Sequence, residues 1–395
     1  MYDYLIIGAG VIGLAVAREL KFKNPDAKIL IVEKESDVGF HSSGRNSGVL
    51  HAGFYYTSSS LKAKFTRDGN RELTKYCLDN NLAINRCKKV VVAKDEDELD
   101  TLHELYKRGV ANGVEVELIG QDRLDRDFKN VKTHKEALLS PTTATVNPKE
   151  ILIHLKNQLI ASGVEIKFNT PYCKEYKDSA KFVINCAGLY ADKIAKEFGF
   201  SRDYKILPFK GIYLQYSKSD SFIDTNIYPV PNLKNPFLGV HYTITVDGHI
   251  KIGPTAIPAF WRENYRGLAN FNIAELADIL ATEAKLFIKN SFGFRDLAIE
   301  EMKKYNKKYF VSLAESMVKE LDSSGFNSWS KPGIRAQLLN TKTNELLQDF
   351  VVEGDSKSVH ILNAVSPAFT SSFPFARWVV QEYINSYRRP VLPLS

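Results

Sequence analysis

The chain has 395 residues, of which 44% are hydrophobic and 25% are charged, and its formal net charge is +7. This composition is that of a folded protein long enough for two or three domains, and it excludes a disordered or collagen-like chain. The basic residues are dispersed along the sequence, which argues against a nucleic-acid-binding protein. Four cysteines without CxxC spacing fit a reducing compartment, and there is no signal-peptide pattern or apolar run long enough to span a membrane, so we expect a cytoplasmic protein.

The first 34 residues carry the most specific pattern. An apolar run at 4–7 leads into the glycine-rich segment GAGVIG at 8–13, and a helix-like segment and a second apolar run at 29–32 follow. This order predicts a βαβ unit that binds a dinucleotide.

Each polar or glycine position in this unit has a physical reason. Gly8 allows the tight turn, Gly10 lets backbone N–H groups approach a pyrophosphate, and Gly13 lets the helix pack closely on the strand. The helix N-terminus attracts the pyrophosphate. Glu33 follows the second strand and would accept the ribose hydroxyls, which disfavours the 2′-phosphate of NADP.

Periodicity and turn residues predict the remaining elements in chain order. A polar loop at 36–60 beside the dinucleotide site is expected to be functional. Between 207 and 253, β-rich runs alternate with turns such as Asp247-Gly248, which predicts an antiparallel sheet. Further helices are predicted over 60–80, 96–112, 150–162, 272–288, 299–320 and 374–387, and further strands over 88–93, 164–168, 181–184 and 359–364. Ligand-binding turns are expected near Gly8, Gly188 and Thr370, and their convergence would require a discontinuous cofactor domain.

The loop HSSGRNSGVLHAGFYY at 41–56 resembles the flavin loop of L-2-hydroxyglutarate dehydrogenases and oxidases, which belong to the D-amino-acid-oxidase-like FAD enzymes. A more specific likeness lies in IYPVP at 227–231, PFLGVHYT at 236–243, DG at 247–248 and IGP at 252–254. GIRAQ at 333–337 and SPAFTSS at 366–372 complete the resemblance, which covers nearly the whole chain. It departs between Thr170 and Asn185, where the family usually carries a longer β-meander before the Asn-Cys-Ala-Gly turn.

The resemblance implies FAD rather than NAD, and we expect the cofactor to be bound noncovalently. It implies an α/β fold with a discontinuous Rossmann-type FAD-binding domain, residues 1–85, 141–205 and 325–395, and an antiparallel-sheet α+β substrate domain, residues 86–140 and 206–324. The cofactor residues implied are Gly8, Gly10, Gly13, Glu33, Lys34, Ser43, Arg45, Asn46, Ser47, Gly188, Thr370 and Ser371. Among these, Thr370 and Ser371 open the last helix and are expected to present N–H groups to the flavin.

Oxidation of an α-hydroxy acid needs a base that removes the hydroxyl proton, and histidine is the usual choice. His51 and His241 lie inside the matching motifs, and either can be the base. Five histidines lie outside these motifs and are expected to be structural: His103, His134, His154, His249 and His360. None has a metal-site spacing, so we predict no metal.

A carboxylate substrate needs cations, and a guanidinium clamps a carboxylate bidentately. Arg335 is therefore the leading substrate-binding candidate, with Arg262, Lys210 and Lys251 weaker. Tyr56 and Tyr242 are expected to donate hydrogen bonds to the substrate.

The resemblance thus predicts oxidation of L-2-hydroxyglutarate to 2-oxoglutarate, with a quinone or oxygen as electron acceptor. Two alternatives stay open. In the first, the enzyme oxidises another α-substituted acid, such as an amino acid, or glycerol 3-phosphate. In the second, the chain is a redox-silent FAD-binding protein. The C-terminal stretch 387–394 mixes cations with apolar residues, which leaves open a peripheral contact with the inner face of a membrane.

Overall fold

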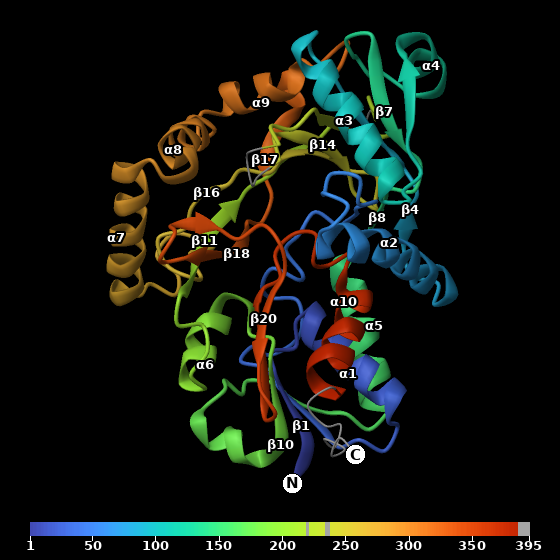
Figure 1. The fold of residues 1–395 in the computed structure, drawn as a ribbon. Helices are drawn as coiled ribbons and strands as arrows, with labels where there is room; N and C mark the ends of the chain where they lie inside the picture. Colours follow the sequence, from blue (N-terminus) through green and yellow to red (C-terminus); the bar gives the residue numbers. More distant parts are fainter. Residues whose placement is uncertain (219–220, 234–237, 386–395) are drawn as a thin grey trace, which may run out of the picture.

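The computed structural model describes residues 1–218, 221–233 and 238–385. Its lower half in Figure 1 is built on a six-stranded sheet that draws strands from the beginning, middle and end of the chain. In order across the sheet these are β20 (Val351–Gly354), β21 (Ser358–Asn363), β10 (Ala180–Asn185), β1 (Tyr2–Ile7), β2 (Ile29–Val32) and β9 (Glu165–Lys167). All neighbours pair in parallel except β20 and β21, so the predicted Rossmann-type sheet is confirmed.

Helices cover the parallel sheet because their apolar faces must be buried against it. The helices α1 (Val11–Lys23), α5 (Pro148–Ala161) and α10 (Ser372–Val379) share one hydrophobic core with the sheet. In Figure 1, α6 (Ala191–Glu197) lies on the other side of β10. Gly13 is required for this packing, since a Cβ there would lie 2.0 Å from the carbonyl oxygen of Gly8.

The upper half contains an eight-stranded sheet. Its strands, in order, are β17 (Phe326–Trp329), β12 (Leu214–Tyr216), β15 (Ile250–Gly253), β14 (His241–Ile244), β13 (Asn226–Pro229), β5 (Lys89–Val92), β7 (Glu136–Ser140) and β6 (Glu117–Gly120). The sheet is mixed rather than antiparallel, because β13 pairs with β5 in parallel where two antiparallel groups from distant segments meet. On one face lies α3 (Asp97–Ala111), and α4 (Gln121–Asp127) and α9 (Lys307–Glu315) contribute to the core on the other.

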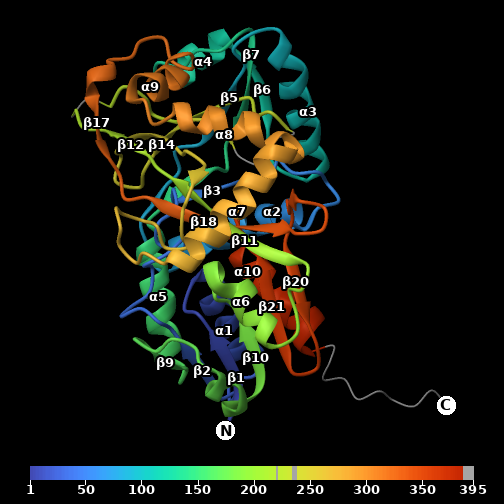
Figure 2. The ribbon, with the colours of Figure 1, turned by 90° about the vertical axis from the view of Figure 1, so that its left-hand side faces the viewer.

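A four-stranded antiparallel sheet lies between the two halves (Figures 1 and 2). It consists of β16 (Ile257–Pro258), β11 (Tyr204–Gly211), β18 (Gly333–Asn340) and β19 (Glu345–Leu346). The region 207–253 is therefore divided between two sheets, contrary to the prediction of one. The helices α7 (Ile273–Lys289) and α8 (Phe294–Lys303) pack against β11 through a separate core.

The remaining elements are short or connect the halves. These are α2 (Leu61–Asp79), a three-stranded sheet of β3 (Val49–Leu50), β8 (Ala144–Val146) and β4 (Ile84–Asn85), the 3-10 segments Lys174–Ser179, Gly188–Tyr190, Ser291–Gly293 and Ser323–Gly325, and a π-helical segment Val380–Asn385 that continues α10. Within the described residues, no helix is both long enough and apolar enough to cross a lipid bilayer.

Two predicted boundaries differ from those in the structure, and one prediction extends beyond the described residues. The single helix expected over 299–320 is divided into α8 and α9, because the Asn306 side chain accepts hydrogen bonds from the N–H groups of Lys308 and Tyr309 and so begins a new helix. The strand β17 belongs to the eight-stranded sheet, although the predicted boundary assigned residues from 325 onward to the cofactor domain. The end of the predicted helix 374–387 and the stretch 387–394 lie outside the described residues.

Candidate cofactor and substrate site

Two adjoining cavities lie at the carboxyl ends of the parallel strands. The outer cavity, about 420 Å³, surrounds the end of β2, and the inner cavity, about 210 Å³, lies between the loop 42–47, β18 and the turn 366–370. Gly10, Ser42, Ser43, Cys186 and Gly188 line both cavities, so they form one elongated site. Their size suits a small-molecule ligand, and their place at the strand ends is where dinucleotides bind such sheets.

The outer cavity contains the predicted ribose-binding groups. Glu33 lines it at the end of β2, and its carboxylate accepts hydrogen bonds from the N–H groups of Ala9 at 2.8 Å and Glu35 at 3.0 Å. Gly8 and Lys34 line the same cavity. Gly8 has a φ of +100°, a conformation that favours glycine, and a Cβ there would lie 2.8 Å from the Cys186 carbonyl oxygen.

The shortened segment after Thr170 also contributes to this cavity. Pro171 and Tyr172 line it, and the preceding Thr170 N–H donates to the Glu33 carbonyl at 2.8 Å. The 3-10 segment Lys174–Ser179 then leads into β10 in place of the longer meander.

Beside the outer cavity, ligand atoms of Glu35, His41 and Glu263 lie within 4.8 Å of one another. Lys34 forms ion pairs with both carboxylates, and the His41 ring is hydrogen-bonded to Glu35 and to the Tyr265 hydroxyl. The Lys34 ammonium thus provides a positive charge that balances the carboxylates of Glu35 and Glu263. Absence of a metal from this protein stays a prediction.

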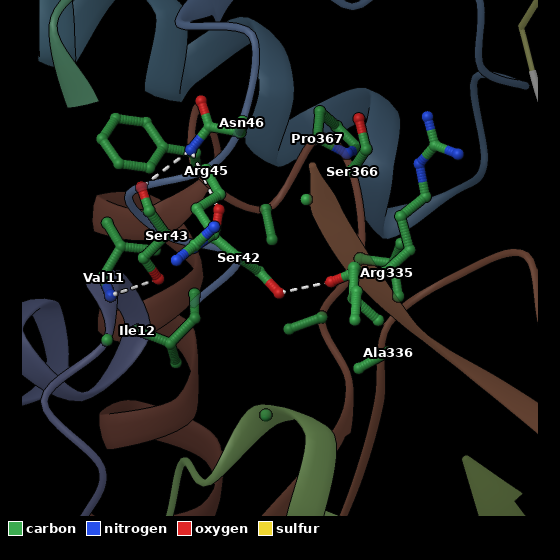
Figure 3. Close-up of a pocket in the computed structure, with 18 of the residues that line it drawn as sticks. Val11, Ile12, Ser42, Ser43, Arg45, Asn46, Arg335, Ala336, Ser366 and Pro367 are labelled. Atoms are coloured by element: carbon green, nitrogen blue, oxygen red, sulfur yellow. Dashed lines mark hydrogen bonds between the residues drawn. The ribbon is translucent and has the colours of Figure 1, made fainter. Parts of the chain in front are cut away.

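The predicted flavin loop lines the inner cavity, and its side chains fix its own shape (Figure 3). The Ser43 hydroxyl accepts a hydrogen bond from the Val11 N–H at 3.0 Å, which attaches the loop to the start of α1. Asn46 donates to the Ser43 carbonyl at 2.8 Å and accepts from the Gly48 N–H at 2.9 Å.

The loop is also attached to the four-stranded sheet. Arg45 donates to the carbonyls of Phe40 at 2.5 Å and Pro332 at 3.4 Å. Gly333 lets β18 approach the loop, since a Cβ there would lie 2.3 Å from the Arg45 carbonyl oxygen. Ser43, Arg45, Asn46 and Ser47 all line the cavity, as predicted for the loop, while their contacts with a flavin stay a prediction.

The turn before α10 meets the prediction only in part. Thr370 lines the inner cavity, and its hydroxyl accepts from the His51 N–H at 3.2 Å. Ser371 does not line it: its N–H donates to the Pro367 carbonyl at 3.0 Å, and its hydroxyl lies 3.2 Å from that of Thr66. The turn thus uses the Ser371 N–H internally, and a contact of Ser371 with the flavin stays a prediction.

His51 and Arg335 line the inner cavity together. Arg335 lies on β18, extends away from Ser42 in Figure 3, and donates to the Thr255 carbonyl at 3.1 Å. Burial lowers the pKa of this guanidinium. Burial and the nearby charge of Lys89 hold the pKa of His51 well below its usual value, so its imidazole is neutral at physiological pH.

His241 lies on β14 and does not line this cavity. Its Nδ1 is 2.8 Å from the Gly239 carbonyl oxygen, and a donor at Nδ1 leaves Nε2 as the proton acceptor. Its ring stacks on Tyr228 with ring centroids 3.7 Å apart. Burial, reinforced by nearby cations, lowers the pKa of His241 to about 3.

A buried lysine whose charge acts on both histidines was missed by sequence reasoning. Lys89 is 0% exposed, and its Nζ has no hydrogen-bond partner among the described residues. Instead the Nζ lies 4.2 Å from the centroid of the Tyr228 ring and within 5.4 Å of the Phe54 and Tyr55 rings. Burial lowers its pKa to about 7, and its charge lowers the pKa of both His51 and His241. The run KVVV has no feature that signals this role.

Three residues that were predicted to bind the substrate line neither cavity: Tyr242, Tyr56 and Arg262. Tyr242 points to the opposite face of β14 from His241 and packs in the core with Phe222 and Phe326, since neighbouring residues of a strand alternate faces. Tyr56 lines neither cavity.

Arg262 has a structural role, because it forms a buried ion pair with Asp192. Its guanidinium forms hydrogen bonds of 2.6 and 2.9 Å with Asp192 and donates to the Leu189 carbonyl. Burial raises the pKa of Asp192, but the hydrogen bonds from Arg262 outweigh this and leave it lowered. A buried pair of this kind leaves no free cation for a substrate.

The two weaker lysine candidates differ. Lys210 donates to the Asn264 side chain at 2.8 Å and does not line the inner cavity. Lys251 donates to the carbonyl of Ser47 at 3.3 Å and lies 4.8 Å over the ring of Tyr213, a further cavity residue. Burial lowers the pKa of Lys251 to about 8. Lys251 is therefore the better candidate of the two.

The residues of this site fit FAD. The outer cavity supplies a carboxylate for the ribose, and the N-terminus of α1 supplies N–H groups for a pyrophosphate. A Cβ on Gly10 would lie 3.1 Å from the Ser43 hydroxyl, so a side chain there would fill the passage between the cavities. The inner cavity, which His51 and Arg335 line, would then take the ring end of the cofactor.

Comparison with known proteins agrees with this geometry. The model of a family described as DAO, FAD dependent oxidoreductase, matches residues 3–382. The chain is 35% identical to a mitochondrial L-2-hydroxyglutarate dehydrogenase of Nematostella vectensis, over 96% of this chain and 90% of that protein. It is 33% identical to L-2-hydroxyglutarate dehydrogenase of Escherichia coli strain K12, over 97% and 93% of the two chains.

Solved structures share the fold. L-alpha-glycerophosphate oxidase from Mycoplasma pneumoniae with FAD bound has a TM-score of 0.73 at 21% identity, covering 96% of this chain and 94% of that one. Glycine oxidase from Geobacillus kaustophilus has a TM-score of 0.68 at 16% identity, covering 100% and 96%. The predicted fold and the predicted cofactor, FAD, are thus confirmed. The chain belongs to the FAD-dependent oxidoreductases of the DAO family and, within it, to the L-2-hydroxyglutarate dehydrogenases.

Proposed function

We propose that this enzyme oxidises L-2-hydroxyglutarate to 2-oxoglutarate with noncovalently bound FAD. The observation that carries the proposal is that Arg335 and His51 line the same cavity that the flavin loop closes. The names of the relatives, each an L-2-hydroxyglutarate dehydrogenase over nearly the full length of both chains, support the choice of substrate.

The substrate has two carboxylates, and the site offers two cations. Arg335 is placed to clamp the carboxylate next to the reacting carbon, because a guanidinium matches a carboxylate bidentately. Lys251, whose ammonium contacts the loop at Ser47, is the candidate for the distal carboxylate. Together they would hold the Cα–H bond in one orientation toward the ring end of the cavity.

When bound, FAD supplies the acceptor for the hydride that leaves Cα. His51 is our choice of base because it lines the cavity, whereas His241 does not. A neutral imidazole nitrogen of His51 takes the proton of the substrate hydroxyl, and the C–O bond becomes the carbonyl of the product. The Lys89 charge favours the neutral form of both imidazoles, so the base is ready at physiological pH.

The electron acceptor and the cellular location complete the proposal. The relatives are named dehydrogenases, which favours a quinone over oxygen as the acceptor. A peripheral contact with a membrane would bring the enzyme to such an acceptor. The test is to reduce the FAD-loaded enzyme anaerobically and compare its reoxidation by a soluble quinone analogue and by oxygen; much faster reoxidation by oxygen would contradict the choice of quinone.

Substrate choice is tested by mixing the FAD-loaded enzyme anaerobically with L-2-hydroxyglutarate, its D enantiomer, glycine, larger amino acids and glycerol 3-phosphate. We expect L-2-hydroxyglutarate to bleach the flavin fastest. The matched variants Arg335→Met and Lys210→Met compare a cation that lines the cavity with a half-buried cation that does not. Bleaching by glycine or glycerol 3-phosphate but not by hydroxyglutarate would refute the proposal, and bleaching by no acid would favour a redox-silent protein.

A further inference from the structure

A buried ion pair at the end of α8 has no part in the proposed reaction. Glu301 and Lys304 are 4% and 6% exposed, and their side chains form an ion pair. Taking two charges out of water is costly, so a buried pair needs further hydrogen bonds. Glu301 has one, because its second carboxylate oxygen accepts from the Ala256 N–H at 2.5 Å. This bond connects α8 to the segment that precedes β16.

The peptide unit between Thr255 and Ala256 is bonded through both of its polar groups. Its N–H donates to Glu301, and its carbonyl accepts from the Arg335 guanidinium at 3.1 Å. In a trans peptide these two groups point in opposite directions, so the unit lies between the carboxylate and the guanidinium. A charged acceptor on the N–H polarises the peptide and makes its carbonyl a stronger acceptor. Glu301 is therefore linked to Arg335 through a single peptide unit.

The segment that contains this peptide belongs to the wall of the inner cavity. Pro254 lines the cavity. The Thr255 hydroxyl donates to the Lys210 carbonyl at 3.0 Å and accepts from the Ile212 N–H at 3.1 Å, which fixes the segment to the end of β11. Glu301 adds a bond from α8, which contacts β16 (Figure 1). A change at Glu301 would thus reach the cavity wall from outside the cavity.

Charge also connects Glu301 and Arg335. Burial lowers the pKa of the Arg335 guanidinium, and the Glu301 carboxylate acts in the opposite direction because it favours the charged form. A guanidinium that clamps a carboxylate must be charged and must point in a fixed direction. Glu301 supports both conditions, although it does not line the inner cavity itself.

We propose that Glu301 is a positioning residue for substrate binding: it holds the 255–256 peptide so that Arg335 meets the carboxylate next to the reacting carbon. The inference rests on the proposed function, in which Arg335 binds this carboxylate. It adds a residue outside the cavity that sets the affinity for the substrate. A role limited to the attachment of α8 would affect stability and leave that affinity unchanged.

The test measures the Kd of the FAD-loaded enzyme for 2-oxoglutarate, from the change in flavin absorbance, and the KM for L-2-hydroxyglutarate. Glu301→Gln keeps the side-chain volume and one acceptor oxygen but removes the charge, so we expect both constants to rise about threefold. Glu301→Leu also removes the acceptor and should raise them about tenfold. The rate of flavin reduction at saturating substrate should change by less than about twofold, because a loss of uniform binding raises KM alone.

Two neighbouring residues supply matched controls. Glu300 pairs with Lys303 at 3.4 Å and accepts from the Tyr309 hydroxyl instead, so Glu300→Gln should leave both constants unchanged. Lys304→Met breaks the buried ion pair but keeps the bond between Glu301 and the 255–256 peptide. It should lower stability in urea unfolding and change the Kd by less than about twofold.

The variant Arg335→Met separates this inference from the proposed function. In the Arg335→Met enzyme, Glu301→Gln should weaken binding no further, because both changes remove the same interaction. If Arg335→Met binds 2-oxoglutarate as tightly as the wild type, the proposed function fails and this inference fails with it. The inference alone is overturned if Arg335→Met weakens binding while Glu301→Gln does not, or if Lys304→Met weakens binding as much as Glu301→Gln. Glu301→Gln decides the question if Glu301→Leu does not fold.

Discussion

Replacing Lys89 with methionine should stabilise the folded enzyme at neutral pH. The Lys89 amine is fully buried and has no hydrogen-bond partner among the described residues, and burial lowers its pKa to about 7. In an unfolded chain a lysine has a pKa of about 10.4. The unfolded chain therefore binds one more proton than the folded chain between about pH 7 and pH 10.4, and this favours unfolding.

The size and the pH dependence of the effect follow from these two values. At pH 7 the cost to the folded state is about 4 kcal/mol, since each pH unit between the two pKa values corresponds to about 1.4 kcal/mol. The cost is fully present below about pH 7 and disappears as the pH rises toward about 10.4. Methionine has similar length and no charge. We expect Lys89→Met to gain about 2 to 4 kcal/mol at pH 7 and only about 1 kcal/mol near pH 9.5.

Urea unfolding of the FAD-loaded wild type and variant at these two pH values measures the difference. The control is Lys88→Met, because Lys88 is the neighbouring residue but exposed, and its replacement should change stability by less than about 0.5 kcal/mol. A Lys89→Met enzyme that is less stable at neutral pH, or whose gain does not depend on pH, would show that this amine is not an unpaired buried cation. If the gain is found together with slower flavin reduction, Lys89 is retained for activity at the expense of stability.

Four further results are expected. Gly333→Ala should weaken FAD binding about tenfold, because the new Cβ would lie 2.3 Å from the Arg45 carbonyl oxygen and displace the loop; a flavin fluorescence titration with unchanged affinity would contradict this. Glu33→Gln should also weaken FAD about tenfold in the same titration through loss of a charged acceptor, and an effect on turnover alone would argue against a ribose role. Arg262→Leu should cost about 3 to 5 kcal/mol in urea unfolding by leaving Asp192 buried and unpaired, with KM unchanged; a large rise in KM without loss of stability would return Arg262 to the substrate site. The rate of flavin reduction should show no histidine-like loss near pH 6, since burial and nearby cations keep the pKa of His51 well below its usual value and that of His241 at about 3; a fall in rate centred near pH 6 would mean that the base is solvated or is another group.

The dinucleotide half of the fold could be predicted because its signals are local. The glycines at 8, 10 and 13, the two apolar runs and Glu33 all lie within one βαβ unit, and the structure places them as that unit requires. The break between α8 and α9 also had a local signal, Asn306, a residue that commonly begins a helix. The position of Tyr242 followed from strand alternation, since it cannot share a face with His241.

What could not be predicted depends on contacts between distant residues. Arg262 pairs with Asp192, 70 positions earlier in the chain, and nothing near either residue indicates the pair. The parallel joint between β5 and β13 likewise joins segments more than a hundred residues apart. Lys89 is buried because of that joint, which brings Tyr228 against its amine. Its effect on the pKa of both histidines is therefore a property of the assembled sheet.

The most direct test of the proposed reaction is the product formed in a single turnover. FAD-loaded enzyme is mixed under nitrogen with L-2-hydroxyglutarate labelled with deuterium at Cα, and flavin reduction and 2-oxoglutarate are measured together. We predict one 2-oxoglutarate for each flavin reduced, a slower rate with deuterium, and loss of both in His51→Gln. Flavin that stays oxidised, or that is reduced without formation of 2-oxoglutarate, would contradict the proposed reaction.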